Sequence, residues 1–126
     1  MHELALCRAV LAQAARIAAA HGAHAVRRVE LRVGPLSGAV PELLREAFAV
    51  ARAGTCAQEA ELVVHEGAVE VECGACGARA PAAAPNRLCC PACGDWRTRV
   101  VAGDELLIER VELALAPRAR EEESDV

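Results

Sequence analysis

Apolar residues recur at helical spacing near the start of the chain. Residues 3–20 are rich in Ala, Leu, Arg and Gln and contain neither Gly nor Pro, a composition that favours a helix. Spacings of mostly three and four predict a buried face, made of Leu4, Ala5, Leu11, Ala12, Ala15 and Ala19. Gly22 follows as a suitable stop, because glycine readily takes the left-handed conformation that ends many helices.

Residues 26–33 then contain a run in which apolar and charged residues alternate. The apolar residues are Val29, Leu31 and Val33, and the charged residues are Arg28, Glu30 and Arg32. In a strand these two sets lie on opposite faces, so the pattern predicts a strand with one face in water. The sequence predicts two further strands, over residues 60–65 and 106–115. On the last of these, Val111, Leu113 and Leu115 share one side.

A second helix is predicted to begin at Pro41, because proline suits the first turn of a helix. Its apolar face contains Leu43, Leu44, Ala47, Phe48 and Ala51, and Gly54 ends it. Two helices that cover one face of a three-stranded sheet form a stable two-layer arrangement. The predicted fold class is therefore α+β, with two helices packed on a three-stranded, mainly antiparallel sheet and an inserted Cys₄ zinc-ribbon subdomain.

Two Cys-x-x-Cys motifs, here called the knuckles, are separated by thirteen residues, and a glycine follows each; they are Cys73-Gly74-Ala75-Cys76 and Cys90-Pro91-Ala92-Cys93. Two thiolates two residues apart can reach one metal ion from a single tight turn. Two such turns at this separation are typical of a zinc ribbon. Four thiolates leave no open coordination position, which favours a structural zinc over a catalytic one. Iron, as in rubredoxin-like knuckles, and redox-active thiols are the alternatives.

The ribbon is predicted to interrupt the larger sheet between its second and third strands. Val69 and Val71 alternate with Glu70 and Glu72 towards the first knuckle, and residues 96–101 form the second arm. Residues 79–86 are rich in Ala and Pro, which favours an irregular connection. The expected division is residues 1–67 with 103–116 as one domain, 68–102 as the ribbon domain, and 117–126 as a charged, disordered tail.

Composition excludes several function classes. The net charge of −4 and the two aromatic residues, Phe48 and Trp96, argue against nucleic-acid binding, which needs clustered cations. The seven cysteines are an odd number without a recognisable signal peptide, which indicates a reducing compartment, and we expect a cytoplasmic protein. Charged and polar residues interrupt the Ala-rich start, so no membrane span is expected.

The remaining cysteines and the internal histidines receive no metal-binding role. Cys89 is expected to be a spare or packing thiol beside Cys90, and Cys7 to pack in the core. His21 and His24 flank a helix end, where capping or solvation is the expected role. His65 ends a strand and receives no role.

Met1, His2 and Glu3 offer a second set of metal donors. The α-amine, the His2 backbone nitrogen and the His2 imidazole can close fused chelate rings around one ion. The Glu3 amide or carboxylate can add a fourth donor. Such a set suits Ni(II) or Cu(II) better than Zn(II), and it requires a neutral imidazole, so acid should release the metal. Composition alone favours the alternative, a frayed terminus.

Several motifs form one pattern over residues 1–115: Met1-His2-Glu3-Leu4, Val33-Gly34-x-Leu36-Ser37, Ala47-Phe48 before Gly54-Thr55, Ala60-x-Leu62, Cys73-x-x-Cys76 and Cys90-Pro91-x-Cys93-Gly94. Together they resemble the HypA/HybF family, the nickel metallochaperones of [NiFe]-hydrogenase maturation. Zinc knuckles alone occur in many ribbons. Their combination with a Met-His-Glu start is much more specific.

The resemblance implies a nickel site on the N-terminus and a structural zinc in the ribbon. His2 becomes the essential nickel ligand, with the Met1 α-amine and the His2 and Glu3 backbone nitrogens as companions. The four knuckle cysteines hold zinc. The protein is then not an enzyme but a metallochaperone that delivers Ni(II), with a GTP-hydrolysing partner, to the [NiFe]-hydrogenase large subunit. Some members also support urease maturation, which adds a urease accessory protein as an expected partner of a monomer or homodimer.

One position departs from the family pattern. Some members place an acidic residue, an accessory nickel contact, where this sequence has Val40, and the nearest acid is Glu42. The alternative function is a zinc-ribbon module that binds protein or nucleic acid and makes no use of its N-terminus. One zinc and one nickel per chain would support the chaperone, whereas zinc alone would support the interaction module.

Overall fold

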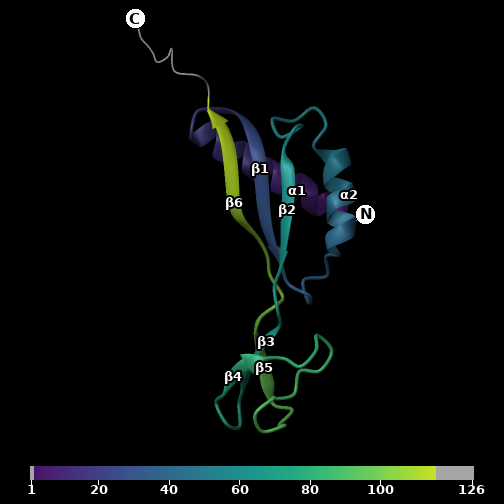
Figure 1. Ribbon diagram of the computed structural model, residues 1–126, viewed down its shortest axis with the longest axis vertical. Helices are drawn as coiled ribbons and strands as arrows, with labels where there is room; N and C mark the ends of the chain where they lie inside the picture. Colours follow the sequence, from purple (N-terminus) through teal and green to yellow (C-terminus); the bar gives the residue numbers. More distant parts are fainter. Residues whose placement is uncertain (1, 116–126) are drawn as a thin grey trace, which may run out of the picture.

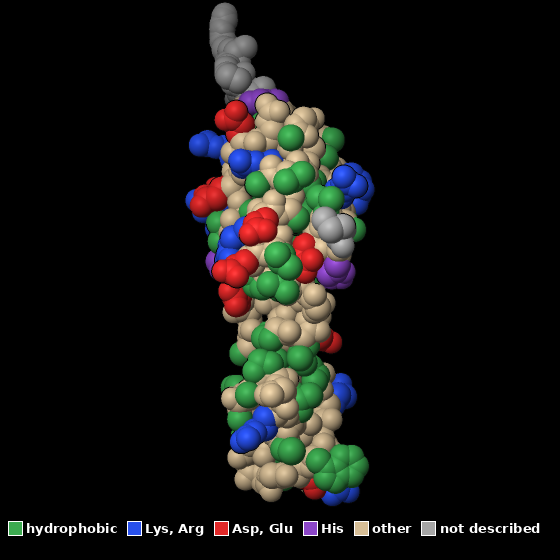
Figure 2. Space-filling model, turned by 90° about the vertical axis from the view of Figure 1, so that its right-hand side faces the viewer, with side chains coloured by type: hydrophobic (Ala, Val, Ile, Leu, Met, Phe, Trp, Pro, Cys, Tyr) green, Lys and Arg blue, Asp and Glu red, His purple; other side chains and the backbone are tan. Residues whose placement is uncertain are grey.

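The computed structural model describes residues 2–115, which form two helices and two three-stranded sheets. Figures 1 and 2 show an elongated molecule with the smaller sheet at one end, and in Figure 2 most charged side chains lie over the part that contains the larger sheet. In chain order the elements are α1 His2–Ala20, β1 Ala23–Val33, α2 Pro41–Ala51, β2 Glu61–Glu66, β3 Glu70–Cys73, β4 Arg79–Pro81, β5 Thr98–Ala102 and β6 Leu106–Leu115.

The larger sheet has the order β2-β1-β6 and is mixed. β6 pairs antiparallel with β1, as expected, whereas β2 lies parallel to it, with Val29 opposite both Val111 and Leu62. The parallel pairing follows from the connection, because α2 carries the chain back before β2 begins and a parallel neighbour requires such a crossover. The α+β class, with two helices on a three-stranded sheet and an inserted ribbon, is confirmed.

Helix α1 buries a different face from the one predicted. Leu11 is the only buried residue of the expected stripe, and the buried residues are Cys7, Val10, Leu11, Ala14 and Ala18. Alanine occurs all round this helix, so the spacing of apolar residues does not select a single face. Within residues 2–115 no helix is long and apolar enough to span a membrane.

The core lies between the two helices and one face of the larger sheet. From α2 it receives Leu44 and Phe48, and from β1 the buried side chains are Val26, Val29, Leu31 and Val33. The alternation predicted for β1 is therefore confirmed. Burial of this aliphatic face, at about 25 cal/mol per Å² of apolar surface, is the main force that holds the helices to the sheet.

Strand β6 covers the predicted residues but contains a bulge. Glu30 pairs with Arg110 while the next residue, Leu31, pairs with Ile108, which leaves Glu109 as the extra residue. Because the bulge shifts the alternation by one, Leu106 and Ile108 contact the core together with Val111 and Leu113. Leu115, predicted to share that side, is 62% exposed.

The smaller sheet has the order β4-β3-β5, with both pairings antiparallel. The segment 79–86, expected to be irregular throughout, begins with β4, which pairs with β3. A proline is compatible with this strand because β4 lies at the edge of the sheet and Pro81 is its last residue. At such a position the missing N–H does not interrupt the hydrogen bonds between strands.

The two sheets meet at a tight junction of three backbone segments. Leu36 N–H donates to the Gly103 carbonyl at 2.7 Å, and Gly67 N–H donates to the Val33 carbonyl at 3.1 Å. The expected domain division passes through this junction and stays a prediction. Residues 116–126, which include the predicted tail, lie outside the described part of the chain.

Substitution of Gly103 by alanine is expected to destabilise this junction. Gly103 has a φ of +112°, and a Cβ there would lie 2.6 Å from Val69 Cα. Backbone strain and overlap together should lower the free energy of unfolding by at least about 3 kcal/mol. Urea unfolding measures the loss. Gly38→Ala is the matched control, because Gly38 also has a positive φ but faces open space, and its cost should be about 1–2 kcal/mol. Equal losses in both variants would contradict the tight junction.

Candidate metal centre

The four knuckle cysteines come together at one point of the smaller sheet. Their sulfur atoms all lie within 4.8 Å of one another. The Sγ–Sγ distance is 3.6 Å between Cys73 and Cys93 and 3.7 Å between Cys76 and Cys90. A tetrahedral site with Zn–S bonds of about 2.3 Å has edges of about 3.8 Å. The sulfur positions therefore fit a tetrahedral divalent ion of zinc's size.

Each knuckle is a tight turn that a glycine completes. Gly77 and Gly94 have φ values of 76° and 82°, and their N–H groups donate to the Cys73 and Cys90 carbonyls at 3.0 and 2.8 Å. The turn directs further amides at the sulfurs: Ala75 N and Cys76 N each lie 3.3 Å from Cys73 Sγ, and Ala92 N lies 3.4 Å from Cys90 Sγ. Amides aimed at sulfur favour the thiolate, which is the form that binds metal.

The first cysteine of each knuckle is the more acidic. The backbone N–H of Cys76 lowers the pKa of the Cys73 thiol, and the N–H of Cys93 lowers the pKa of Cys90 to about 7. The Asp95 N–H opposes the shift, but contacts with the sulfurs of Cys73, Cys76 and Cys90 and partial desolvation together raise the pKa of Cys93 to about 12. Some of the four thiols therefore keep their protons, and binding of a divalent cation would release those protons.

Arg97 places a positive charge beside the sulfur cluster. Its backbone N–H and guanidinium donate to the Asp95 carboxylate at 2.8 to 3.0 Å, which lowers the pKa of Asp95 to about 2. The Arg97 carbonyl accepts the Gly74 N–H at 2.7 Å. Four thiolates around a divalent ion carry a net charge of −2, and a nearby guanidinium stabilises that charge. The spacing of residues in the sequence does not indicate a role for this pair.

The other cysteines lie where the sequence predicts. Cys7 is 1% exposed, and its Sγ donates to the Leu44 carbonyl at 3.3 Å. Burial raises the pKa of this thiol. Cys89 is exposed and stays outside the cluster that contains Cys90.

Of the N-terminal donors, His2 and Glu3 lie at the first turn of α1. His2 is the first helical residue and is exposed, whereas Met1 lies outside the described residues. A Glu3 carboxylate oxygen accepts the Val40 backbone N–H at 3.3 Å. Val40 is the N-cap of α2, and that helix has no side-chain cap hydrogen bond. Glu3 therefore satisfies the backbone N–H of the N-cap residue itself and ties the start of α1 to the start of α2. In the described part of the chain, the knuckle cysteines are the one group of three or more His, Cys, Asp or Glu side chains close enough to share an ion.

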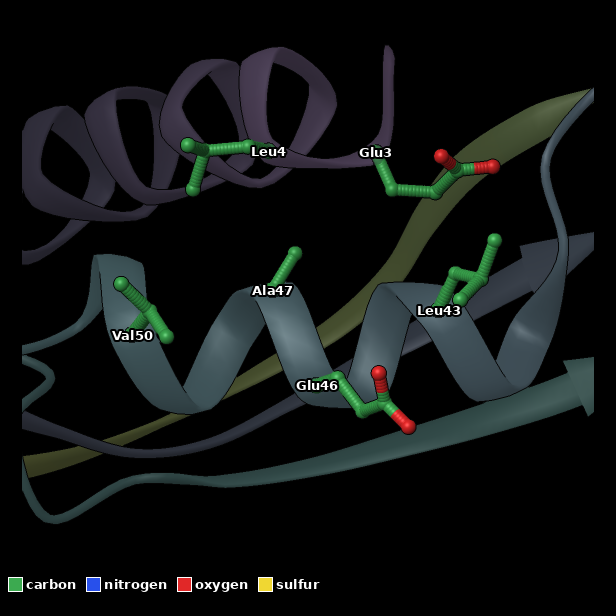
Figure 3. A pocket seen from close by; sticks show the side chains of 6 residues that line it. All are labelled: Glu3, Leu4, Leu43, Glu46, Ala47 and Val50. Carbon is green, nitrogen blue, oxygen red and sulfur yellow. The ribbon is translucent and has the colours of Figure 1, made fainter. Parts of the chain in front are cut away.

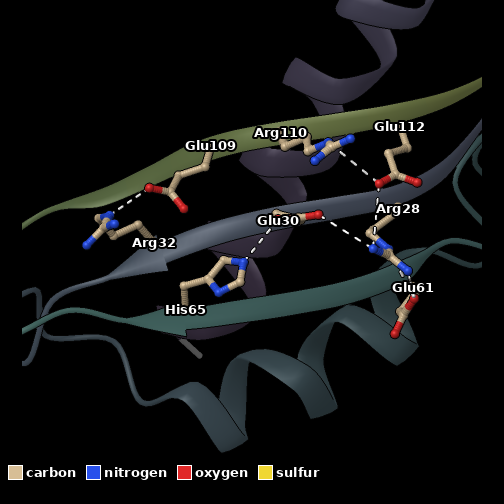
Figure 4. A network of polar contacts seen from close by, with 8 residues as sticks. All are labelled: Arg28, Glu30, Arg32, Glu61, His65, Glu109, Arg110 and Glu112. Carbon is tan, nitrogen blue, oxygen red and sulfur yellow. Dashed lines mark hydrogen bonds and ion pairs between the residues drawn. The ribbon is translucent and has the colours of Figure 1, made fainter.

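His65, which received no role, belongs to a charged network on the exposed face of the larger sheet (Figure 4). Its Nε2 lies 3.0 Å from a Glu30 oxygen, and this hydrogen bond, with the charges of Arg110 and Arg28, lowers the pKa of Glu30. His21 bonds the Ile17 carbonyl through Nδ1 at 2.9 Å, which confirms its capping role. Neither histidine shares an ion site with the described cysteines or acids.

Comparison with known proteins gives one consistent family. Residues 1–113 match the sequence profile described as "Hydrogenase/urease nickel incorporation, metallochaperone, hypA". The chain is 42% identical over 113 residues to the hydrogenase maturation factor HypA of Nitrosospira multiformis, covering 90% of this chain and 97% of that protein. It is 39% identical over 111 residues to the HypA of Chlorobium limicola, covering 88% and 95%.

Two solved structures share the fold. The solution structure of the Ni metallochaperone HypA from Helicobacter pylori matches with a TM-score of 0.69 at 23% identity, covering 90% of this chain and 98% of that one. A second solution structure of a HypA protein matches with a TM-score of 0.70 at 26% identity, covering 92% and 98%. The chain therefore belongs to the HypA family of hydrogenase/urease nickel-incorporation metallochaperones, which are not enzymes.

Proposed function

We propose that this protein binds Ni(II) at its N-terminus and delivers it, with a GTP-hydrolysing partner, to the large subunit of a [NiFe]-hydrogenase during maturation. The observation that carries the proposal is the exposed His2 at the first position of α1, in a chain of the nickel-incorporation family. The relatives named hydrogenase maturation factors support hydrogenase as the destination. Urease maturation, with its accessory protein, is a second route within the same family description.

The nickel ligands we propose are the His2 imidazole, the Met1 α-amine and the backbone nitrogens of His2 and Glu3. The first N–H groups of a helix have no intrahelical acceptor, so these nitrogens are free to exchange a proton for a metal. A deprotonated amide carries negative charge, which the positive end of the helix dipole stabilises. The Glu3 carboxylate already accepts the Val40 N–H, so the Glu3 backbone supplies the donor, and Val40 adds no acidic contact.

We propose Zn(II) as the resident metal of the four knuckle cysteines. Sulfur spacings of 3.6 and 3.7 Å suit a tetrahedral ion, and the site would hold the ribbon domain, residues 68–102, in its fold. The nickel domain would then contain residues 1–67 and 103–116. We place the protein in the cytoplasm, where free thiols persist, as a monomer or homodimer.

Addition of one glycine before Met1 is expected to weaken nickel binding by about tenfold or more. The extension moves the α-amine away from the His2 imidazole, so one chelate ring is lost, while zinc should remain at one per chain. Calorimetric titration with Ni(II) and elemental analysis of untagged protein measure both metals. The matched control carries the same glycine after Val126. Unchanged nickel affinity in the N-terminal variant would refute a site that uses the α-amine.

A further inference from the structure

A surface groove lies between the start of α1 and one side of α2. Its volume is about 450 Å³, and its lining consists of Glu3, Leu4, Leu43, Glu46, Ala47 and Val50. Figure 3 shows Leu4 facing Ala47, with Leu43 and Val50 towards the two ends of the same face of α2. The volume lies within the about 300–1,000 Å³ range typical of ligand pockets, so it can hold several aliphatic side chains.

The groove and its surroundings concentrate exposed apolar surface. Leu43 is 45% and Val50 68% exposed, and the connection before α2 adds Leu36 and Val40 at 38% and 46%. Of the seven exposed large hydrophobic residues in the described chain, four therefore fall within residues 36–50. Single exposed apolar residues are ordinary, but a contiguous group of them marks an interaction surface.

The charge of the groove selects the chemistry of its occupant. The lining residues include two carboxylates, Glu3 and Glu46, and no cation. A segment that places aliphatic side chains on the floor and Lys or Arg beside the carboxylates satisfies both features of the groove. An amphipathic helix with apolar residues at helical spacing and a basic flank is the common form of such a segment.

We propose that this groove binds a basic amphipathic helix of a partner protein. A second copy of the chain is a poorer occupant, because a symmetric contact would bring the same carboxylates together. The chain's own residues 116–126 are also unsuitable, because they contain Glu121, Glu122, Glu123 and Asp125 against two arginines. Like charges placed opposite one another disfavour both of these contacts.

The location of the groove gives this partner a role in nickel transfer. Glu3 lines the groove and follows His2 directly in the chain. A helix seated there would lie beside the proposed nickel ligands and could exchange metal with them or shield them. This role rests on the proposed function, whereas binding of the helix to the groove does not.

The test uses three synthetic 18-residue helical peptides with the same leucine face and with Lys, Gln or Glu at the polar positions. Calorimetry gives the affinities, and amide chemical shifts of the full-length protein locate the site. The Lys peptide should shift the amides of Leu4 and of residues 43–50. The Gln peptide should bind about tenfold more weakly, and the Glu peptide more weakly still.

Substitutions in the groove should reduce binding of the Lys peptide. Glu46→Lys and Val50→Asp should each weaken it by about tenfold. The matched controls, Glu42→Lys on the same helix and Leu107→Asp on β6, lie outside the groove and should leave the affinity within about twofold. All four positions are exposed, so circular dichroism should report an unchanged fold.

Equal binding of the Lys and Gln peptides, unchanged affinity in both groove variants, or absence of shifts in residues 43–50 would each overturn the proposal. Nickel titration of Glu46→Lys and Val50→Asp separates the two proposals. We expect full nickel binding in both variants. Absence of nickel binding in the unmodified protein, with groove binding retained, would refute the nickel site and leave the groove assignment standing.

Discussion

His2→Ala is expected to abolish nickel binding and to leave one zinc per chain. The imidazole is the strongest neutral donor of the proposed set, and its removal also opens a chelate ring. Changes to groups that only support a ligand cost about 10–100-fold in metal affinity, so loss of the ligand itself should cost more. His2 is exposed, so the fold should not change. Calorimetry with Ni(II), elemental analysis and circular dichroism measure these three results.

His24→Ala is the matched control for this variant, because His24 is also exposed and lies at the start of β1, beyond the other end of α1. It should bind nickel as tightly as the unmodified protein. Stoichiometric nickel binding by His2→Ala would refute the proposed nickel site at the N-terminus. Equal loss in both variants would instead indicate adventitious binding to surface histidines.

Cys90→Ser is expected to remove zinc and to unfold the ribbon. Few side chains stabilise the smaller sheet without a metal: in residues 68–102 the buried apolar residues are Val69, Val71, Cys73 and Cys90. Zinc contributes about 10–16 kcal/mol to small domains of this kind, far more than this core can replace. In ¹H–¹⁵N spectra the amides of β3, β4 and β5 should collapse to unfolded positions, whereas those of α1 and β1 should persist.

Cys89→Ser provides an unusually close control, because Cys89 is the neighbouring residue and is exposed outside the cluster. It should retain one zinc and a folded ribbon. Zinc lost from Cys89→Ser but kept in Cys90→Ser would show that the wrong cysteine of the pair had been assigned. Extraction of zinc with a chelator should reproduce the spectrum of Cys90→Ser.

The two proposed metal sites differ in how firmly the fold positions their ligands. The knuckles are built by backbone turns that fix four sulfurs and aim amides at them, an arrangement suited to permanent retention of an ion. His2 and Glu3 lie at the exposed start of α1, where a hydrogen bond joins Glu3 to the Val40 N–H. A site that is easily opened suits an ion that must be handed on.

The local sequence determined the two helices, the strands of the larger sheet and the knuckles. Alternation over residues 28–33 of β1 identifies the buried face of that part of the strand, and the Cys-x-x-Cys-Gly spacing brings two sulfurs to one turn wherever it occurs. β6 begins and ends as predicted, at Leu106 and Leu115. These features depend on residues within a few positions of one another, so a single sequence is sufficient to find them.

Tertiary contacts decided which faces are buried, how the strands pair and where the groove forms. An Ala-rich helix offers apolar residues on every side, so packing against the sheet and against α2 selected the face of α1 that contains Cys7, Leu11 and Ala14. The parallel partner of β1, the bulge in β6 and the hydrogen bond from the Val40 N–H to Glu3 join residues far apart in the chain. The groove likewise exists only because α1 and α2 lie side by side. Sequence periodicity records which residues are apolar, but it does not record which neighbour will cover them.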